Sequence, residues 1–164
     1  MTTESDVKIP LTAQHFAKIL EAAAPGEWIE IKRASPFITK VGPVMMRNVD
    51  GFVELRLDVV RDHTNARGAV HGGMVATFAD IALGRNLAMK SKPGRYYVTT
   101  SLNVNYLAAT TEGDCLIAKI HSVKAGTRVG FVAGQILSNG RAVAEISGTF
   151  CAIETTETRD LDTP

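Results

Sequence analysis

The chain has 164 residues, which is enough for one domain with a sizeable core, and no stretch is long or polar enough to link two domains. Its 18 Lys and Arg residues almost balance its 17 Asp and Glu residues, so the net charge creates no overall field for nucleic acid or an anionic membrane. We therefore expect neither as a partner, and any anionic ligand must be held by local features.

The two cysteines, Cys115 and Cys151, lie in apolar alternating segments without a Cys-x-x-Cys or Cys/His ligand pattern. This is typical of small core residues in a reduced cytosolic protein, and a single long-range disulfide is the alternative. The first ten residues do not resemble a signal peptide, and nowhere do 18 uncharged apolar residues run together. We expect a soluble, cytoplasmic protein.

An amphipathic helix is predicted near the N-terminus, in the segment "LTAQHFAKILEAAA". Phe16, Ile19 and Leu20 share one face of this helix. Thr12 is a candidate N-cap, and Pro25 followed by glycine marks the end.

Two strands are predicted next, in "FITKVGPVMMRN" and "GFVELRLDVV". In the second, Val53, Leu55 and Leu57 alternate with charged residues, as in a strand with one buried face. The pair Asp50-Gly51 lies between the two segments and is a hairpin turn signal.

The central segment, residues 73–84, contains only two polar side chains, those of Thr77 and Asp80. A helix that is apolar on nearly all sides is buried, so we expect Asp80 to lie largely out of water. An unpaired buried carboxylate is costly or is forced to protonate. Asp80 should therefore either accept hydrogen bonds from a neighbouring loop, and only order the packing, or perform a chemical task.

Small and polar residues form one stripe of this predicted helix, because helical spacing brings them to one side. The members of the stripe are Gly73, Ala76, Thr77, Asp80 and Gly84. The stripe leaves room beside the carboxylate for a partner chain, a ligand or a water. The other residues of the helix can serve the core: Met74, Phe78, Ile81, Ala82 and Leu83.

The turn before the helix offers hydrogen-bond donors. Gly72 and Gly73 open the helix, and free backbone N–H groups at a helix start can hold a carbonyl oxygen that becomes an oxyanion. Considered alone, His71 would cap the helix or bond a neighbouring carbonyl, and Asn65 would be a turn residue. Together with Asp80, the set suits the addition of water or a carboxylate to a carbonyl.

A single copy of the helix cannot bring both halves of this site to the same atom. Gly72 and Asp80 are separated by about two turns, which is about 11 Å of rise. A second copy of the helix, running antiparallel beside the first, would bring the Asp of one chain to the glycines of the other. The chemistry therefore predicts a dimer with two shared sites.

Four strands in hairpin succession are predicted after the helix: "YVTTSLNVNYL", "DCLIAKIHSV", "TRVGFVAGQILS" and "RAVAEISGTFCAI", the last two joined by an Asn-Gly turn. The first strand alternates between an apolar face of Val98, Leu102, Val104 and Tyr106 and a polar face of Thr99, Ser101, Asn103 and Asn105. Hairpins favour an antiparallel sheet, and the apolar central helix can bury its surface only against that sheet. The sequence predicts an α+β domain in which the sheet wraps a long helix.

One motif combines the turn, the helix start and the helix carboxylate: Asn65, Gly68, His71-Gly72-Gly73 and Asp80. Followed by "VTTSLNVNYLAATTEGD", this motif resembles the hotdog-fold acyl-CoA thioesterases of the phenylacetate-pathway (PaaI-like) type, and the resemblance covers roughly residues 41–153. It implies hydrolysis of an acyl-CoA to a free carboxylic acid and CoA. It also implies a homodimer with a continuous sheet, often paired again into a homotetramer, a dimer of dimers.

The resemblance implies a role for each residue of the motif. The backbone N–H of Gly72 would polarise the thioester carbonyl. Asp80 of the opposite subunit would act as general base on water or as nucleophile, and Asn65 would position the water or the reacting carboxylate. His71 would orient the turn and the substrate carbonyl, and Thr99 on the following strand would help to hold the water.

Coenzyme A would bind as part of the substrate rather than as a cofactor, with its phosphates on basic side chains and loop backbone of the dimer surface. The turn "KAGTR" matches a glycine-basic turn of the family, which gives these candidates: Lys124, Gly126, Thr127 and Arg128, together with Gly73 at the helix start. Three more cations follow the central helix: Lys90, Lys92 and Arg95. The alternative for all of these cations is a solvated face.

We divide the chain into an N-terminal helical extension (1–28), a hotdog domain (29–155) and a polar tail (156–164).

Two other functions compete: an acyl-CoA-binding sensor or scaffold, which would have no use for a buried base, and a hydratase or dehydratase, whose His-Phe-Pro type signature is absent. A metal site is not expected, because the histidines match no standard ligand spacing. The sequence does not predict which acyl group is cleaved.

Overall fold

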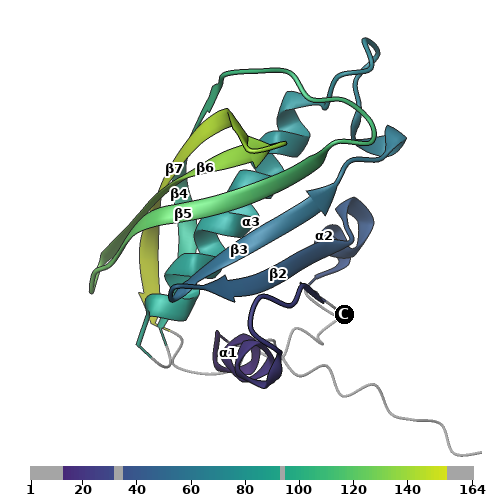
Figure 1. Cartoon of the computed structure of the whole chain (residues 1–164). Helices are drawn as coiled ribbons and strands as arrows, with labels where there is room; N and C mark the ends of the chain where they lie inside the picture. The colour runs from purple at the N-terminus through teal and green to yellow at the C-terminus, as the bar shows by residue number, and fades with distance from the viewer. Residues whose placement is uncertain (1–12, 32–34, 93–94, 155–164) are drawn as a thin grey trace, which may run out of the picture.

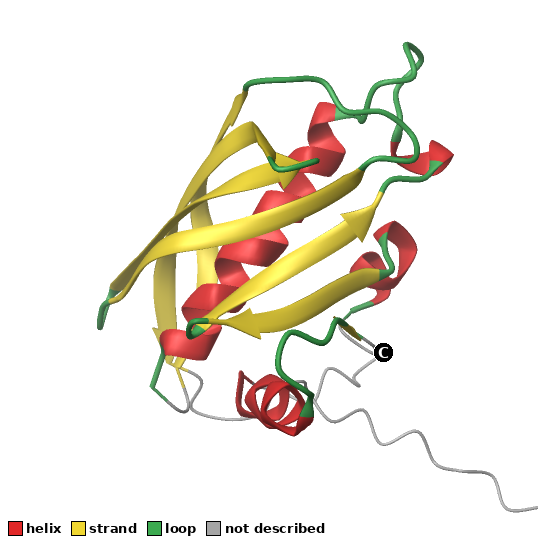
Figure 2. Ribbon diagram, in the orientation of Figure 1, coloured by secondary structure: helices red, strands yellow, loops and turns green. Residues whose placement is uncertain are grey.

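A long helix lies against the inner face of a curved antiparallel sheet in the computed structural model (Figures 1 and 2). The structure describes residues 13–31, 35–92 and 95–154. The helices are α1 (Ala13–Ala22), α2 (Pro36–Val41), the 3-10 turn η1 (Arg61–His63) and α3 (Gly72–Lys90). The strands are β1 (Ile29–Glu30), β2 (Val44–Val49), β3 (Phe52–Asp58), β4 (Arg95–Tyr106), β5 (Cys115–Ala125), β6 (Val129–Ser138) and β7 (Arg141–Glu154).

The described strands form one sheet in the order β1-β2-β3-β5-β6-β7-β4, and every neighbouring pair is antiparallel. The helix α3 packs on the inner face of this sheet (Figure 1). The predicted α+β architecture is therefore confirmed, and each of the four strands after the helix begins and ends within two residues of its predicted limits. The strand β4 pairs only with β7, which leaves its other edge open within the described chain.

Both predicted two-residue hairpins are present. Asp50 and Gly51 join β2 to β3 with φ angles of +51° and +79°, and Asn139 and Gly140 join β6 to β7 with +50° and +76°. Positive φ at both central residues matches the twist of the flanking strands and favours Asn, Asp and Gly. These local signals therefore predicted the turns correctly.

The segment from residue 36 to residue 41 is a helix, where we predicted the start of a strand. The Ser35 hydroxyl accepts a hydrogen bond from the Ile38 N–H at 3.1 Å, and Pro36 occupies the first turn. A Ser N-cap followed by Pro is a helix-start signal, and here it outweighs the alternation of apolar residues that follows. The first long strand, β2, begins only at Val44.

Only one side of α3 is buried by the sheet. Met74, Phe78, Ala82 and Leu83 are buried as predicted, whereas Ile81 is only half-buried. The stripe of small and polar residues, which includes Asp80, lies on the open side, and Asp80 is partly exposed. The prediction that Asp80 lies largely out of water is therefore wrong for the single chain, because nothing in the described chain covers this side of the helix fully.

A β-bulge changes which side chains of β4 face the helix. Thr99 pairs with Phe150 and the register then shifts, so that Thr100 is an extra residue in β4. Thr99 shares the inner face with the buried Phe150 and with Leu102, whereas Val98 is turned to the outer face and is 45% exposed. The predicted faces of this strand are therefore wrong at Val98 and Thr99, because strict alternation does not allow for a bulge.

The N-terminal helix is present and contributes to the core through Leu20, which is buried, and Ile19, which packs against the core. The proposed N-cap Thr12 and the side chain of Phe16 lie outside the described part of the chain, as does the predicted tail, residues 156–164.

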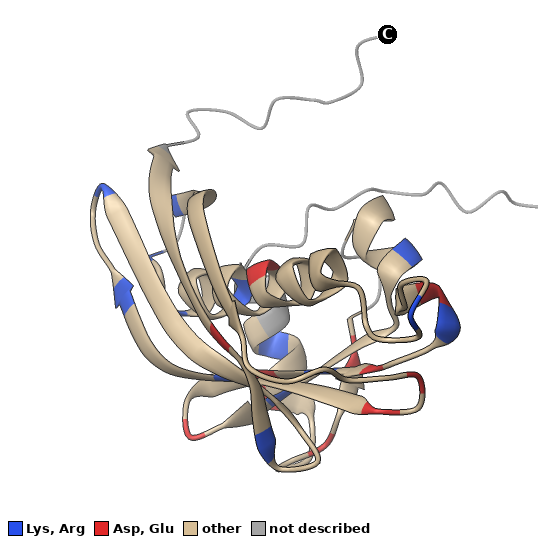
Figure 3. Ribbon diagram, turned by 90° about the horizontal axis from the view of Figure 1, so that it is seen from above, with Lys and Arg blue, Asp and Glu red and all other residues tan. Residues whose placement is uncertain are grey.

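Among the described helices, none is both long enough and apolar enough to cross a membrane. Figure 3 shows cationic and anionic residues on helices, strands and turns, with neither sign confined to one element.

Both cysteines are free thiols, so the alternative of a disulfide is not realised. Cys115 is half-buried, and burial raises the pKa of its thiol. Cys151 is exposed on the outer face of β7, so the prediction that it is a core residue is wrong. Cys151 alternates with the buried Phe150, so β7 has one buried face and one exposed face, and Cys151 lies on the exposed one.

Candidate active site

The carboxylate of Asp80 and the hydroxyl of Thr99 are directly bonded. Thr99 Oγ1 donates a hydrogen bond to Asp80 Oδ1 at 2.8 Å, which joins α3 to β4. Asp80 Oδ2 has no hydrogen-bond partner in the described part of the chain. The structure therefore brings together two residues that the sequence placed in the site, and it leaves one carboxylate oxygen accessible for a water or a substrate.

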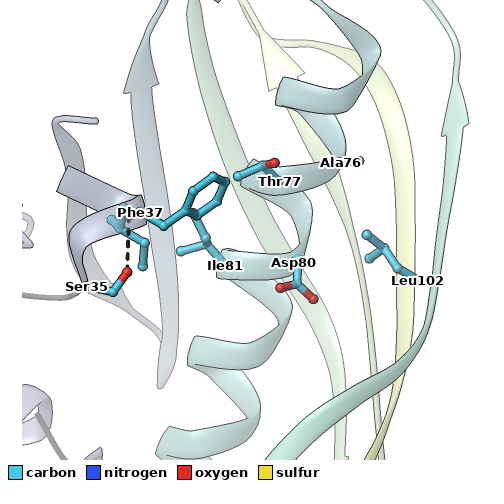
Figure 4. Close-up of a pocket in the computed structure, with 8 residues that line it drawn as sticks. Ser35, Phe37, Ala76, Thr77, Asp80, Ile81 and Leu102 are labelled. Atoms are coloured by element: carbon cyan, nitrogen blue, oxygen red, sulfur yellow. Dashed lines mark hydrogen bonds between the residues drawn. The ribbon is translucent and has the colours of Figure 1, made fainter. Parts of the chain in front are cut away.

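A pocket of about 400 Å³ opens beside Asp80 on the side of α3 that the sheet does not cover (Figure 4). Its walls come from α2, from α3 and from Leu102 of β4. The lining side chains are Ser35, Phe37, Ile38, Ala76, Thr77, Asp80, Ile81 and Leu102. Apart from Asp80 and two hydroxyl groups this lining is apolar, which is the usual composition of a small-molecule site.

His71 caps α3, which is the role that its position alone predicted. Its Nδ1 accepts a hydrogen bond from the Gly73 N–H at 2.9 Å, so the proton of a neutral His71 ring is on Nε2. The Gly73 N–H, which we expected to contact CoA, is therefore bonded within the chain. The Gly72 N–H, in contrast, has no hydrogen-bond partner among the described residues. It remains the free donor at the helix start.

Tyr106 contacts the same helix start, and sequence reasoning missed this contact. The Tyr106 hydroxyl donates to the Gly72 carbonyl oxygen at 2.8 Å. The peptide group between Gly72 and Gly73 is thus bonded on both sides, by Tyr106 at its oxygen and by His71 at its N–H. The sequence placed Tyr106 on the apolar face of its strand, which did not indicate a partner.

Asn65 acts as a turn residue in the segment before α3. Its Oδ1 accepts from the Arg67 N–H at 2.8 Å, and its carbonyl oxygen accepts from the Gly68 N–H at 2.9 Å. Gly68 has a φ of +77°, which favours glycine. The Asn65 side chain bonds neither Asp80 nor Gly72 within the chain, and its amide NH₂ group is not engaged among the described residues.

The KAGTR turn joins β5 to β6 and exposes its three polar side chains, those of Lys124, Thr127 and Arg128. Gly126 is fixed by two hydrogen bonds: its N–H donates to the Val129 carbonyl at 3.2 Å, and its carbonyl accepts from the Tyr97 hydroxyl at 2.7 Å. The turn thus has a defined backbone with solvated cations. No described contact joins it to Asp80.

Other titratable groups near α3 have structural partners. His63 is buried: its Nδ1 accepts from the Val60 N–H at 3.2 Å and its Nε2 lies 3.0 Å from the Val41 carbonyl oxygen. Burial lowers the pKa of Arg85, one turn beyond Ile81, to about 10. In the part of the chain that the structure describes, no group of three His, Cys, Asp or Glu side chains could hold a metal ion.

The two halves of the predicted site do not meet within one chain. Asp80 and Gly72 lie on the same straight helix, at a separation of about two turns, or about 11 Å of rise. The structure thus places the carboxylate with its hydroxyl donor at one level of α3, and the free N–H with its supporting contacts at another. Asp80, Thr99 and the pocket form one half-site, and Gly72, His71 and Asn65 form the other.

A family model described as the thioesterase superfamily matches residues 67–145. A Pseudomonas aeruginosa protein named "Putative esterase" is 33% identical over 121 residues, which covers 72% of this chain and 89% of the relative. The human protein named acyl-coenzyme A thioesterase 13 is 26% identical over 99 residues, which covers 56% of this chain and 70% of the relative. The match to the family model spans both the helix start and Asp80.

Solved structures share the fold. A mutant of the phenylacetic acid degradation protein PaaI from Thermus thermophilus superposes with a TM-score of 0.63 at 24% identity, covering 71% of this chain and 98% of its own. A "Hypothetical Thioesterase Protein with Coenzyme A" from Streptococcus pneumoniae superposes with a TM-score of 0.61 at 26% identity, covering 70% of this chain and 88% of its own. The predicted hotdog fold and the resemblance to PaaI-like proteins are both confirmed.

Proposed function

This chain belongs to the thioesterase superfamily, and we propose that it hydrolyses acyl-CoA thioesters to a free carboxylic acid and CoA, at two sites shared between the subunits of a homodimer. The observation that carries the proposal is the bond between Thr99 and Asp80 beside an apolar pocket. A carboxylate with one oxygen fixed and the other accessible is suited to act on a water or on a carbonyl carbon. A protein that only binds acyl-CoA would not need such an oriented carboxylate.

In the proposed reaction, Asp80 removes a proton from a water as the water oxygen bonds to the thioester carbonyl carbon. The electron pair of the carbonyl π bond moves to its oxygen, which accepts a hydrogen bond from the Gly72 N–H of the other subunit. The tetrahedral intermediate then collapses, the C–S bond breaks, and the proton on Asp80 passes to the CoA thiolate. The products are a carboxylic acid and CoA.

Asp80 could instead attack the carbonyl carbon itself and form an anhydride that water then opens. Both routes use the same residues. A single turnover in H₂¹⁸O separates the two routes. In the nucleophilic route, water that attacks the Asp80 carbonyl of the anhydride leaves ¹⁸O in the Asp80 carboxylate, whereas the general-base route places no ¹⁸O there. Mass spectrometry of the Asp80 peptide measures this.

The proposed dimer is supported by two open surfaces of the single chain. The small-residue stripe of α3 is only partly covered, and β4 has an unpaired edge along its 12 residues. Unpaired edges of this length are usually covered in native proteins. Pairing of β4 with its copy would continue the sheet and set two α3 helices antiparallel, which places Asp80 of one subunit near Gly72 of the other.

A second interface would make the dimer of dimers. Exposed apolar side chains gather on the outer face of β4, β6 and β7, where the register sets Val98, Cys151 and Val129 in one row across the strands. Phe131 and Ile153 lie in neighbouring rows of that face, and both are exposed. A contiguous apolar patch of this kind is typical of an interaction surface.

Substrate binding would place the CoA phosphates near the KAGTR turn. Lys124 and Arg128 are solvated cations on a turn whose backbone is fixed by Tyr97. Cations of this kind suit phosphate oxygens, and Arg can bind two of them at once. CoA is thus proposed as part of the substrate, and the proposal requires no separate cofactor.

The test is thiol release from a panel of acyl-CoA thioesters, followed with a colorimetric thiol reagent. We expect Asp80→Asn to lower kcat by about 10²–10⁴-fold, the range for loss of a general base. Asp58→Asn, in an exposed ion pair with Arg56 on β3, is the control and should keep wild-type rates. Binding without thiol release by the wild-type protein would instead identify a sensor or scaffold.

A further inference from the structure

The pocket beside Asp80 receives part of its wall from outside the region that matches the superfamily model. Ser35, Phe37 and Ile38 belong to α2 or precede it, whereas the model matches residues 67–145. The reacting groups therefore lie in the matched region, and one side of the pocket is built by a different segment. Such a segment can vary the substrate without disturbing the chemistry.

Phe37 is the large side chain that α2 presents to this pocket. Its side chain is 58% exposed, and Figure 4 shows its ring directed across the pocket toward α3, near Thr77. Leu102 of β4 lies on the opposite side of Asp80 (Figure 4). An aromatic ring in this position would lose most of its contact with water once an apolar group entered the pocket, which is favourable.

The helix that carries Phe37 is firmly held. Ser35 caps its start, and Ile38 and Val41 pack against the core on its inner side. The Nε2 atom of the buried His63 lies 3.0 Å from the Val41 carbonyl oxygen. This contact fixes the end of the helix. The ring is therefore presented by a fixed element rather than by a loose loop, as selection between similar ligands requires.

The lining favours an uncharged acyl group. None of the side chains that line the pocket is cationic, and the only ionisable one is Asp80, whose negative charge repels a carboxylate. The Ser35 hydroxyl already accepts a hydrogen bond from the Ile38 N–H. The volume of about 400 Å³ lies in the lower part of the range for small-molecule sites, which suits a phenyl ring or a chain of several carbons better than an acetyl group.

We propose that Phe37 is a specificity-determining residue, which selects acyl-CoA thioesters with an uncharged, apolar acyl group by packing its ring against that group. This inference rests on the proposed function, because it concerns the same site. Asp80 and Thr99 act on the thioester, and Phe37 contacts only the acyl group. Its removal should therefore alter the choice of substrate and leave the chemical step intact.

The experiment compares kcat/KM for acetyl-, butyryl-, hexanoyl-, octanoyl-, phenylacetyl- and succinyl-CoA. For the wild-type protein we expect a rise of about threefold to fourfold for each methylene from butyryl to octanoyl, which is the effect of burying one CH₂ group. Succinyl-CoA, with a carboxylate at the end of the chain, should be at least about tenfold poorer than butyryl-CoA, which has the same number of carbons.

Phe37→Ala should lower kcat/KM for octanoyl- and phenylacetyl-CoA by about tenfold or more, mainly through KM, and change the values for acetyl-CoA by less than about twofold. Phe37→Leu should recover most of the octanoyl activity. Lys40→Ala is the matched control, because Lys40 is exposed on the same short helix and does not line the pocket. It should keep the wild-type profile.

Three results would overturn the inference while leaving the proposed function in place. These are an unchanged acyl profile in Phe37→Ala, an equal loss for all acyl groups, and wild-type turnover of succinyl-CoA as fast as that of hexanoyl-CoA. Absence of thiol release from every thioester by the wild-type protein would refute the proposed function itself. The circular dichroism spectrum of each variant, compared with that of the wild-type protein, shows that it is folded.

Discussion

At the scale of single residues, two hydroxyl groups of β4 donate hydrogen bonds to the two residues of α3 for which we propose a chemical role. Thr99 donates to the Asp80 carboxylate and Tyr106 donates to the Gly72 carbonyl, both at 2.8 Å. A hydrogen bond to a carboxylate orients the side chain and leaves the second oxygen for a water. The strand therefore acts as the support of the helix site as well as a part of the sheet.

Thr99→Ala should lower kcat by about tenfold or more, because a hydrogen bond to a charged group contributes roughly 1.5–3 kcal/mol. Thr99→Ser keeps the hydroxyl and should recover most of the rate. Steady-state thiol release with one good substrate measures both variants. A Thr99→Ala protein with the wild-type kcat would show that this hydroxyl does not orient the carboxylate in the reaction.

The structure bonds two residues that the sequence assigned to the site, Asp80 and Thr99, but the contact itself could not be predicted from the sequence. Asp80 and Thr99 both followed from the motif, but their bond depends on the bulge at Thr100, a single extra residue that no alternation pattern reveals. The same bulge is the reason that Val98 faces outward. The contact of Tyr106 with Gly72 depends on how a strand and a helix start pack together, which is a long-range property.

At the scale of elements, α2 lines one side of the pocket, and the sequence predicted a strand in its place. Its residues alternate in a way that resembles a strand, and the helix is decided by the cap at Ser35 and by the packing of Ile38 and Val41 on the core. The Asn-Gly and Asp-Gly hairpins were predicted correctly, because their geometry is set by two residues. Two residues are enough to predict these turns, whereas the short helix depends on both its cap and its tertiary packing.

Ser35→Ala removes the cap of α2 and should lower the free energy of unfolding by about 1 kcal/mol, which for a chain of this size lowers Tm by about 2–4 °C. Ser35→Asp retains a capping oxygen and should keep Tm close to that of the wild-type protein. Thermal unfolding followed by circular dichroism measures both. Equal Tm values for Ser35→Ala and the wild-type protein would argue that the core contacts of α2 alone hold it.

At the scale of the whole molecule, the single chain has an open helix face and an open sheet edge next to each other. The stripe of α3 that contains Asp80 is only partly covered, and β4 carries both an unpaired edge and the hydroxyl groups that support the site. The separation of about 11 Å between Gly72 and Asp80 along α3 was evident from spacing alone, and the structure retains it. A shared site follows only if two chains pair along these surfaces.

The sharing of the site can be tested with two inactive variants that fail for different reasons. Asp80→Asn removes the carboxylate. Gly72→Pro removes the free N–H while remaining compatible with the helix, because Pro is favoured at the first helical position and His71 before it already has the extended conformation that Pro requires, with φ −63° and ψ 132°. Each variant alone should release little or no thiol.

The most direct measurement is the thiol-release rate of the mixed dimer, in which Asp80→Asn and Gly72→Pro chains carry different affinity tags, are produced together and are purified through both tags. If each site takes its carboxylate from one chain and its N–H from the other, one of the two sites is intact and the mixed dimer should show about half of the wild-type rate. If each chain holds a complete site of its own, both sites carry a defect, and a mixed dimer as inactive as its parents would contradict the account.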